Sequence, residues 1–483
     1  MTIAKTLLSI VFVVSGSDLN AQPKRLKPAP VFPVPSAQQL AWHAMEMNAF
    51  IHFTTNTFTD KEWGYGDESP AVFNPDTVDA VQWAKVLRET GFKGMILTCK
   101  HHDGFCLWPS AYTEHSVKNS PFRNGKADIV KEVSEAARKN NLAFGVYLSP
   151  WDRNRADYGR PSYLDYYRNQ LKELFTQYGP IFEMWFDGAN GGDGYYGGTR
   201  DKRSIDGSRY YEWPRTLEMV TGIQPNVLFF SDAGPHIRWV GNERGVAGST
   251  NWNMINPDTL YAGKPGITKL LGTGSEDGTK WIPAEVDVSI RPGWFYHASE
   301  DSKVKTPEEL FRIYLTSVGR GSNLLLNIPP DRTGRFNEMD VQSLRGFRKI
   351  LDSVFARNLA SEAQVSASVN RRGKWFRPQT MIDNDKHTYW SAPDGEDTAT
   401  VELRWGRARS LRYLVIQEYI ALGQRVKSFS VDVFTNGEWK TVAKETTVGY
   451  KRILPIGNLH SDALRIRITA ARACPLISNV EVY

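Results

Sequence analysis

The chain has 483 residues, which is enough for two or three domains of about 150 residues, although an α/β barrel alone uses about 250. Its hydrophobic fraction of 41% and charged fraction of 23% are ordinary for a globular protein and exclude a disordered, collagenous or coiled-coil chain. The 59 basic and 53 acidic residues give a net charge of +6 without a long basic run, which argues against nucleic-acid binding.

The first predicted element is a signal peptide over residues 1–21. Lys5 precedes the apolar run Leu7–Val14, and Ala21 marks the expected cleavage point. This run is shorter than the roughly 20 residues that a membrane-spanning helix needs, and no other long apolar stretch follows. We therefore expect an exported protein without a membrane span, and its low cysteine content favours the bacterial periplasm.

The three cysteines are Cys99, Cys106 and Cys474. Their odd number and their spacing exclude a disulfide framework and a cysteine-based zinc site. Aromatic residues make up 12% of the chain, and such side chains serve sugar-binding sites as stacking platforms. A tryptophan-rich core is an equally ordinary explanation.

After a proline-rich linker, helix and strand patterns alternate as far as residue 358. The patterns predict helices at 74–90, 128–137, 164–178, 310–314 and 338–355, and strands at 95–98, 143–148, 181–186, 227–230 and 324–326. The strands are almost continuously apolar, which indicates a parallel sheet covered by helices. Both a doubly wound sheet and a closed barrel satisfy this pattern.

Two observations favour the barrel. No glycine-rich nucleotide-binding loop follows the first strands, whereas polar residues directly follow two of them, at 100–103 and at 187–188. Chemistry at the carboxyl ends of strands is typical of barrels. We therefore predict a (β/α)8-like catalytic domain over residues 22–358.

The pattern changes beyond residue 358. Short alternating runs such as 411–416, 429–434 and 464–468, with a turn signal at Asn436-Gly437, predict an all-β sandwich domain over residues 359–483.

Two acidic residues are candidates for catalysis. Asp187 ends the predicted strand 181–186 and precedes Gly188, so its carboxylate would be held at a barrel mouth; capping of the next element is the alternative. Glu243 follows the strand that ends near Phe230, where a solvated loop charge is the alternative. Glycosidic cleavage requires two carboxyl groups, one protonating the leaving oxygen and the other attacking the anomeric carbon or activating water.

Two adjacent histidines, His101 and His102, follow a predicted strand directly. Imidazole groups donate to or accept from sugar hydroxyls. A metal site is the weaker interpretation, because only His52 and Asp103 are obvious further ligands. We expect neither a metal nor a cofactor.

Six stretches together resemble the α-L-fucosidases of glycoside hydrolase family 29. In chain order they are NTFTDKEWG (56–64), KHHDGF (100–105), YLSPWD (147–152), MWFDG (184–188), WVGNE (239–243) and PGWFY (292–296). The fifth stretch resembles the subfamily that prefers α-1,3/1,4-linked fucose on branched glycans. The resemblance implies a fucosylated oligosaccharide or glycoconjugate as substrate.

The same resemblance implies a retaining mechanism through a covalent fucosyl-enzyme intermediate. It assigns the nucleophile to Asp187 and the acid/base to Glu243, with Glu276 and Glu285 as alternatives for the acid/base. It implies fucose contacts from His52, Glu62, Trp63, His101, His102 and Tyr147. Trp185, Trp294 and Phe295 are candidates for an aromatic wall against the C6 methyl group, and Arg291 is a candidate hydrogen-bond donor.

Two other functions stay open at this point: a glycan-binding protein without catalysis, and a hydrolase of another deoxy or galacto-configured sugar. The C-terminal segment resembles discoidin-type or carbohydrate-binding sandwiches at MIDND (381–385), Tyr389-Trp390 and the final VEVY. Such a domain either binds sugar or covers the barrel. Asp383 and Asp385 offer oxygen ligands for Ca²⁺, with a solvated turn as the alternative.

Overall fold

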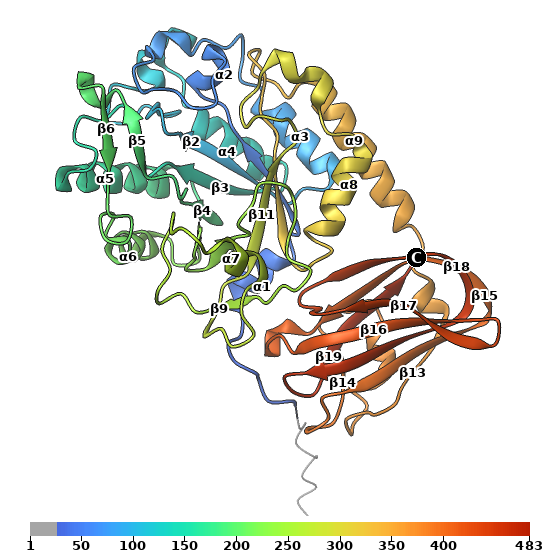
Figure 1. The fold of residues 1–483 in the computed structure, drawn as a ribbon. Helices are drawn as coiled ribbons and strands as arrows, with labels where there is room; N and C mark the ends of the chain where they lie inside the picture. The colour runs from blue at the N-terminus through green and yellow to red at the C-terminus, as the bar shows by residue number, and fades with distance from the viewer. Residues whose placement is uncertain (1–26) are drawn as a thin grey trace, which may run out of the picture.

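The computed structural model describes residues 27–483, which form a barrel followed by an all-β domain (Figure 1). The predicted signal peptide lies outside the described residues. No helix within residues 27–483 is long and apolar enough to cross a bilayer.

Eight strands close into a barrel in which every neighbouring pair is parallel. Around the barrel they are β1 (Met47–Ile51), β12 (Asn323–Asn327), β11 (Ala284–Ser289), β8 (Ile237–Trp239), β7 (Leu228–Ser231), β4 (Glu183–Trp185), β3 (Ala143–Leu148) and β2 (Gly94–Lys100). The prediction of a barrel is therefore confirmed, and the doubly wound alternative is excluded.

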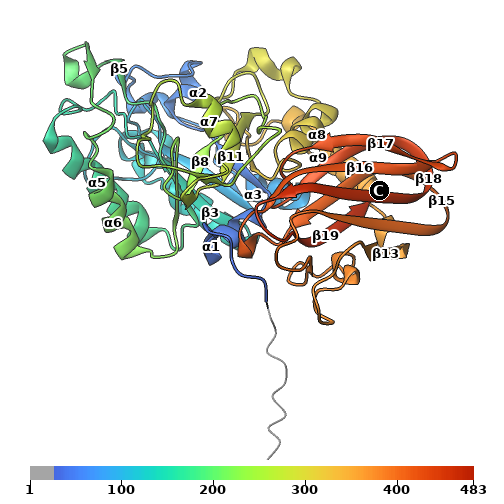
Figure 2. The same cartoon turned by 60° about the horizontal axis from the view of Figure 1, so that its bottom comes forward.

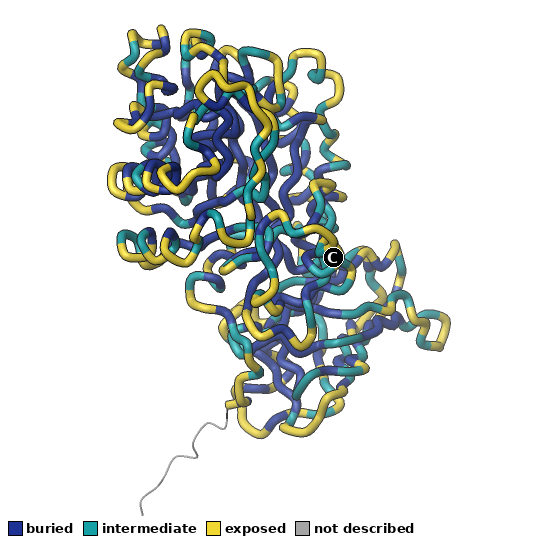
Figure 3. Tube along the Cα trace, turned by 60° about the vertical axis from the view of Figure 1, so that its left-hand side comes forward, coloured by how far each residue is buried: buried dark blue, intermediate teal, exposed yellow. Residues whose placement is uncertain are grey.

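Helices pack on the outside of this barrel, with their outer faces exposed to solvent (Figures 1 and 3). They are α3 (Ala80–Thr90), α4 (Ile129–Lys139), α5 (Pro161–Gln177), α6 (Trp213–Ile223), α7 (Thr268–Thr273), α8 (Pro307–Thr316) and α9 (Glu338–Val354). One predicted boundary is wrong: α3 begins at Ala80 and not near Asn74. The reason is its cap, because the side chain of Asp79 accepts a hydrogen bond from the Gln82 amide at 2.9 Å.

Three barrel strands, β1, β8 and β11, lie outside the predicted ones. Strand β11 carries Glu285 and Asp287, two carboxyl side chains that the barrel buries. These charged residues interrupt the apolar run by which a buried strand is predicted from sequence. Strand β8 follows its parallel neighbour β7 after residues 232–236 only. Parallel neighbours normally need a crossover of a dozen residues or more, so the barrel departs from the regular (β/α)8 pattern here.

Shorter elements complete the barrel domain. They are α1 (Ala37–His43), α2 (Thr55–Thr59), the antiparallel pair β5 (Gly191–Gly194) and β6 (Asp201–Ser204), and the antiparallel pair β9 (Met254–Ile255) and β10 (Lys280–Trp281).

The C-terminal domain is all-β and antiparallel, as predicted. Its strands are β13 (Gln364–Ala367), β14 (Trp390–Ser391), β15 (Ala399–Glu418), β16 (Val426–Thr435), β17 (Glu438–Glu445), β18 (Arg452–Ala471) and β19 (Leu476–Val482). They belong to one hydrogen-bonded sheet, in which β15 and β18 each run for 20 residues with register shifts. Bulges bend strands, so both ends of β15 supply side chains to a single core.

The two domains pack directly against each other (Figures 1 and 2). The Gln424 side chain accepts hydrogen bonds from the Asn253 amide at 2.8 Å, and Thr447 accepts one from the Asn251 amide at 2.9 Å. Lys451 pairs with Glu46, which directly precedes β1. The C-terminal domain therefore covers part of the barrel at the amino end of β1.

Candidate active site

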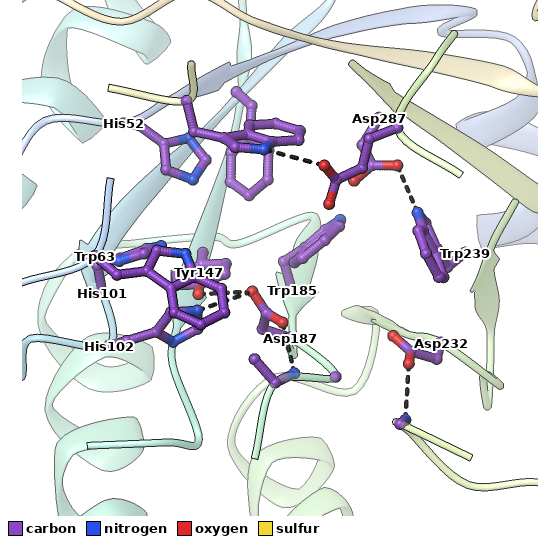
Figure 4. Close-up of a pocket in the computed structure, with 16 residues that line it drawn as sticks. His52, Trp63, His101, His102, Tyr147, Trp185, Asp187, Asp232, Trp239 and Asp287 are labelled. Carbon is purple, nitrogen blue, oxygen red and sulfur yellow. Dashed lines mark hydrogen bonds and ion pairs between the residues drawn. The ribbon is translucent and has the colours of Figure 1, made fainter. Parts of the chain in front are cut away.

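A cavity of about 490 Å³ lies at the carboxyl ends of the barrel strands (Figure 4). Nine of the side chains predicted to form the site line it: His52, Trp63, His101, His102, Tyr147, Trp185, Asp187, Glu243 and Trp294. Seven lining residues were not predicted: Phe50, Gly188, Ala189, Asp232, Trp239, Gly263 and Asp287. All of them come from the barrel domain, so the C-terminal domain adds no side chain to the cavity lining.

Asp187 is held by hydrogen bonds at both carboxylate oxygens. It follows β4 by two residues; its Oδ2 accepts from the Tyr147 hydroxyl at 2.9 Å, and its Oδ1 accepts from the Ala189 amide at 2.8 Å. Its side chain is still 27% exposed. Gly188 leaves room for the neighbouring carboxyl group, because a Cβ there would come within 2.2 Å of Asp232 Oδ2. The barrel thus presents an oriented carboxylate to the cavity.

Three neutral imidazoles line the same cavity from the ends of β1 and β2. Burial lowers the pKa of His52 to about 3, the pKa of His102 to about 4, and that of His101 well below its ordinary value. The Nε2 atom of His102 lies 3.7 Å from Asp187 Oδ2. Uncharged imidazoles suit hydrogen bonds to sugar hydroxyls, because each offers one donor and one acceptor.

The hydrogen bonds of Asn327 fix the tautomer of His52. The Asn327 side-chain amide donates to the Trp294 carbonyl at 2.8 Å and to Ser289 Oγ at 2.9 Å, so its Oδ1 must face His52. His52 Nδ1 lies 2.8 Å from that oxygen and therefore donates to it. The Nε2 atom of His52 remains as an acceptor.

Glu243 lies on the loop after β8, and the fold brings it to the same cavity as Asp187. Its Oε2 accepts a hydrogen bond from Trp294 Nε1 at 3.3 Å. Burial raises the pKa of Glu243, and the charge of Asp187 raises it further, against the opposing effect of the Trp294 hydrogen bond. The oriented carboxyl group of Asp187 and a carboxyl group with a raised pKa therefore share one cavity.

Two further carboxyl groups line the cavity. Asp287 on β11 accepts a hydrogen bond from Trp239 Nε1 at 2.7 Å, and burial raises its pKa well above the ordinary value. Asp232 accepts one from the Gly263 amide at 2.8 Å, and burial raises its pKa to about 6. Asp232 follows a predicted strand just as Asp187 does, and that signal could have identified it. Asp287 offered no such signal, because β11 itself was not predicted.

The charge of the lining is one-sided. Within the described chain, the 16 lining residues include four carboxyl groups and neither lysine nor arginine. Such a cavity disfavours an anionic ligand and suits a neutral sugar that gains positive charge at its anomeric carbon.

Two residues predicted to bind substrate, Glu62 and Arg291, do not line the cavity; they anchor the segment that carries Trp294. Glu62 accepts hydrogen bonds from the backbone amides of Trp294 at 2.7 Å and of Phe295 at 3.1 Å. Arg291 is fully buried and donates to Asp340 at 3.0 Å and to Asp301 at 2.9 Å. Direct sugar contact by Glu62 or Arg291 stays a prediction.

The alternative acid/base residues also lie away from the lining. Glu276 pairs with Lys427 of the C-terminal domain at 2.7 Å. Glu285 is buried in the barrel, where it accepts a hydrogen bond from Trp185 Nε1 at 3.0 Å.

Asp383 and Asp385, the residues considered as Ca²⁺ ligands, make hydrogen bonds within a turn. Asp383 accepts hydrogen bonds from the Asp385 amide at 2.9 Å and from Thr388 Oγ1 at 2.8 Å. Across residues 27–483 there is no group of three or more His, Cys, Asp or Glu side chains placed to hold a metal ion.

Comparison with known proteins identifies both domains. Residues 30–353 match the family model described as α-L-fucosidase, and residues 364–478 match the F5/8 type C domain. α-L-Fucosidase 1 of Arabidopsis thaliana is 40% identical over 481 residues, covering 98% of this chain and 92% of that protein. Plasma α-L-fucosidase of Homo sapiens is 27% identical over 330 residues, covering 63% of this chain and 59% of that protein.

Two solved structures share the whole fold. A glycoside hydrolase family 29 member from an unknown rumen bacterium has a TM-score of 0.85 and 42% identity, covering 95% of this chain and 78% of that one. A family 29 fucosidase of Ruminococcus gnavus in complex with fucose has a TM-score of 0.85 and 32% identity, covering 95% and 96%. The chain described here therefore belongs to the α-L-fucosidases of glycoside hydrolase family 29.

Proposed function

We propose that this α-L-fucosidase is a retaining exo-enzyme in which Asp187 is the nucleophile and Glu243 is the general acid/base. The main support is the contrast between the two carboxyl groups that share the cavity. Hydrogen bonds from Tyr147 and Ala189 orient the Asp187 carboxyl group, whereas partial burial raises the pKa of Glu243. A retaining glycosidase needs an oriented nucleophile and an acid with a raised pKa.

The proposed reaction has two steps. Asp187 Oδ attacks the anomeric carbon while the proton of Glu243 passes to the glycosidic oxygen, so the C–O bond breaks and the aglycone leaves neutral. Esterification removes the charge of Asp187, which lowers the pKa of Glu243. Glu243 then takes a proton from water, the water oxygen attacks the anomeric carbon, and fucose leaves as Asp187 becomes a carboxylate again.

We further propose that the neutral face of the cavity binds fucose. His52 Nε2 accepts a hydrogen bond from a sugar hydroxyl, because His52 Nδ1 is already used as a donor to Asn327. The indole of Trp185, which is buried and stacks on Phe230 with ring centroids 3.9 Å apart, offers a rigid apolar wall for the C6 methyl group. The fucose-bound relative from Ruminococcus gnavus supports this ligand.

The carboxyl pair also weighs against a binding protein without catalysis. A lectin requires hydrogen-bonding groups and aromatic surfaces, but it has no need for an oriented carboxyl group that shares the cavity with one of raised pKa. Hydrolysis of another deoxy or galacto-configured sugar is the second candidate, since neutral imidazoles can hydrogen-bond the axial hydroxyl of any such sugar.

Linkage preference is proposed from the WVGNE stretch, residues 239–243, which resembles the α-1,3/1,4-specific subfamily. A panel of linkage-defined fucosyl oligosaccharides, with free fucose as the readout, tests this assignment. We expect release from α-1,3- and α-1,4-linked substrates well above release from α-1,2- or α-1,6-linked ones. Equal rates on all four linkages would overturn the preference while leaving the catalytic residues untouched.

The stereochemical course is testable by proton NMR of the first product. Retention predicts that α-L-fucose appears first and then mutarotates, whereas initial β-L-fucose would overturn the double displacement. Export to the periplasm is proposed from residues 1–21, and cell fractionation with N-terminal sequencing of the mature protein tests it.

A further inference from the structure

The segment carrying Trp294 is tied to Glu62 through its backbone. Glu62 accepts hydrogen bonds from the Trp294 amide at 2.7 Å and from the Phe295 amide at 3.1 Å. Gly293 allows this close approach, because a Cβ there would lie 2.6 Å from Glu62 Oε1. The indole of Trp294 then reaches Glu243 Oε2 at 3.3 Å. The position of Glu243 therefore depends on how firmly Glu62 is fixed.

His297 fixes Glu62 from the other side. Its Nε2 lies 2.7 Å from Glu62 Oε1, and its Nδ1 lies 2.7 Å from Asp60 Oδ1. An ionised carboxylate only accepts hydrogen bonds, and a neutral imidazole has one donor. Both contacts are hydrogen bonds at once only if His297 is an imidazolium ion, which also makes them charge-assisted.

The electrostatic surroundings agree with this protonation state. Burial alone lowers the pKa of His297, but the hydrogen bonds to Asp60 and Glu62 outweigh burial and raise it above the ordinary value. Other charged groups nearby are engaged elsewhere. Lys61 pairs with Glu68 at 3.2 Å, Glu300 accepts the Gly293 amide at 3.1 Å, and Asp301 pairs with Arg291 at 2.9 Å.

We propose that His297 is a positioning residue for hydrolysis: by bridging Asp60 and Glu62 as an imidazolium, it holds Trp294 against Glu243. The inference rests on the proposed acid/base role of Glu243. The bridge forms below the pKa of His297 and is lost as the pH rises through it, because the neutral ring can donate to only one carboxylate. Alkaline pH should therefore loosen Glu243 without touching Asp187.

The functional test is His297→Gln, compared on two substrates. One is an α-1,3-fucosylated trisaccharide, whose leaving group needs protonation; the other is α-L-fucosyl fluoride, whose leaving group does not. We expect kcat/KM on the trisaccharide to fall about a few-fold, no more than loss of the Trp294–Glu243 hydrogen bond itself would cost, with no measurable change on the fluoride. His387→Gln, at an exposed histidine of the C-terminal domain, is the matched control.

Two outcomes of this test are distinguishable. Equal losses on both substrates for His297→Gln, with Glu243→Gln still selective for the trisaccharide, would overturn the positioning role alone. If Glu243→Gln itself affects both substrates equally, the proposed acid/base assignment fails instead.

The protonation state is measurable directly by ¹⁵N NMR of histidine-labelled enzyme, with His297→Gln assigning the signal. At pH 7 we expect both ring nitrogens of His297 to be protonated. Asp60→Asn should lower the pKa of His297 by about one unit or more, since it removes one carboxylate partner. A neutral His297 ring at pH 7 in the unsubstituted enzyme would overturn the bridge.

Discussion

The two sides of the cavity hold their carboxyl groups in different ways. Asp187 is fixed by the barrel itself, through the Ala189 amide and the hydroxyl of Tyr147 on the neighbouring strand β3. Glu243 lies on a loop and has one hydrogen bond, from Trp294, whose own segment depends on Glu62. A group at a strand end inherits the rigidity of the sheet, whereas a group on a loop needs support from other segments.

The largest effect should come from the barrel side. Asp187→Asn removes the proposed nucleophile, so we expect kcat to fall about a thousandfold or more on every fucoside, since the proposed intermediate cannot form without it. Steady-state kinetics on the trisaccharide and on fucosyl fluoride checks this. Asp206→Asn, in an exposed turn, serves as the control. Near-normal turnover by a correctly folded Asp187→Asn enzyme would contradict the assignment.

The loop side should show a selective loss. Glu243→Gln removes the proposed proton donor. We expect kcat/KM to fall about a hundred- to ten-thousandfold on the trisaccharide and to change little on fucosyl fluoride. Azide should rescue Glu243→Ala and yield α-L-fucosyl azide, because a small anion can attack the β-linked intermediate without a base and inverts the anomeric carbon a second time. A rescue product of β configuration would argue against this geometry.

Removing one hydrogen-bond donor to Asp187 should have a smaller effect than replacing Asp187 itself. Tyr147→Phe deletes the hydroxyl that donates to Asp187 Oδ2 at 2.9 Å. A hydrogen bond to a charged group is worth about 1.5–3 kcal/mol, so we expect about a ten- to hundredfold fall in kcat/KM on both substrates. Tyr112→Phe, at an exposed tyrosine, should leave both rates unchanged. Loss on the trisaccharide alone would mean that Tyr147 serves the acid and not the nucleophile.

The smallest effect should come from Trp294→Phe. This change removes the indole N–H that stabilises ionised Glu243, so the pKa of Glu243 should rise further. Since the acid must be protonated, the alkaline limb of the pH profile of kcat/KM should move to higher pH, with a fall of only about a few-fold at the optimum. A limb that moves to lower pH would show that Trp294 does not stabilise the charged form.

The same contrast explains what could be predicted from sequence. Asp187 follows an apolar strand, so its place at a barrel mouth was predictable. Strand β11 was not, because Glu285 and Asp287 look like surface residues until Trp185 and Trp239 are seen to donate to them. A buried carboxyl group with an indole partner leaves no local sequence pattern.

Family resemblance gives residue identities but not their orientation. Glu62 and Arg291 are predicted to touch the sugar, and the structure shows in addition that both hold the segment that carries Trp294. His297 lies one residue beyond the PGWFY stretch, and its role became visible only when Asp60 and Glu62 were found at its two ring nitrogens. Contacts between segments far apart in the chain carry this information.

A crystal structure of the enzyme trapped with 2-deoxy-2-fluoro-α-L-fucosyl fluoride tests the shared action of Asp187 and Glu243 most directly. We expect a covalent bond from the anomeric carbon to Asp187 and a separation of about 5–5.5 Å between the Asp187 and Glu243 carboxyl groups. A sugar bonded to another residue, or a Glu243 carboxyl group turned away from the anomeric centre, would contradict the mechanism.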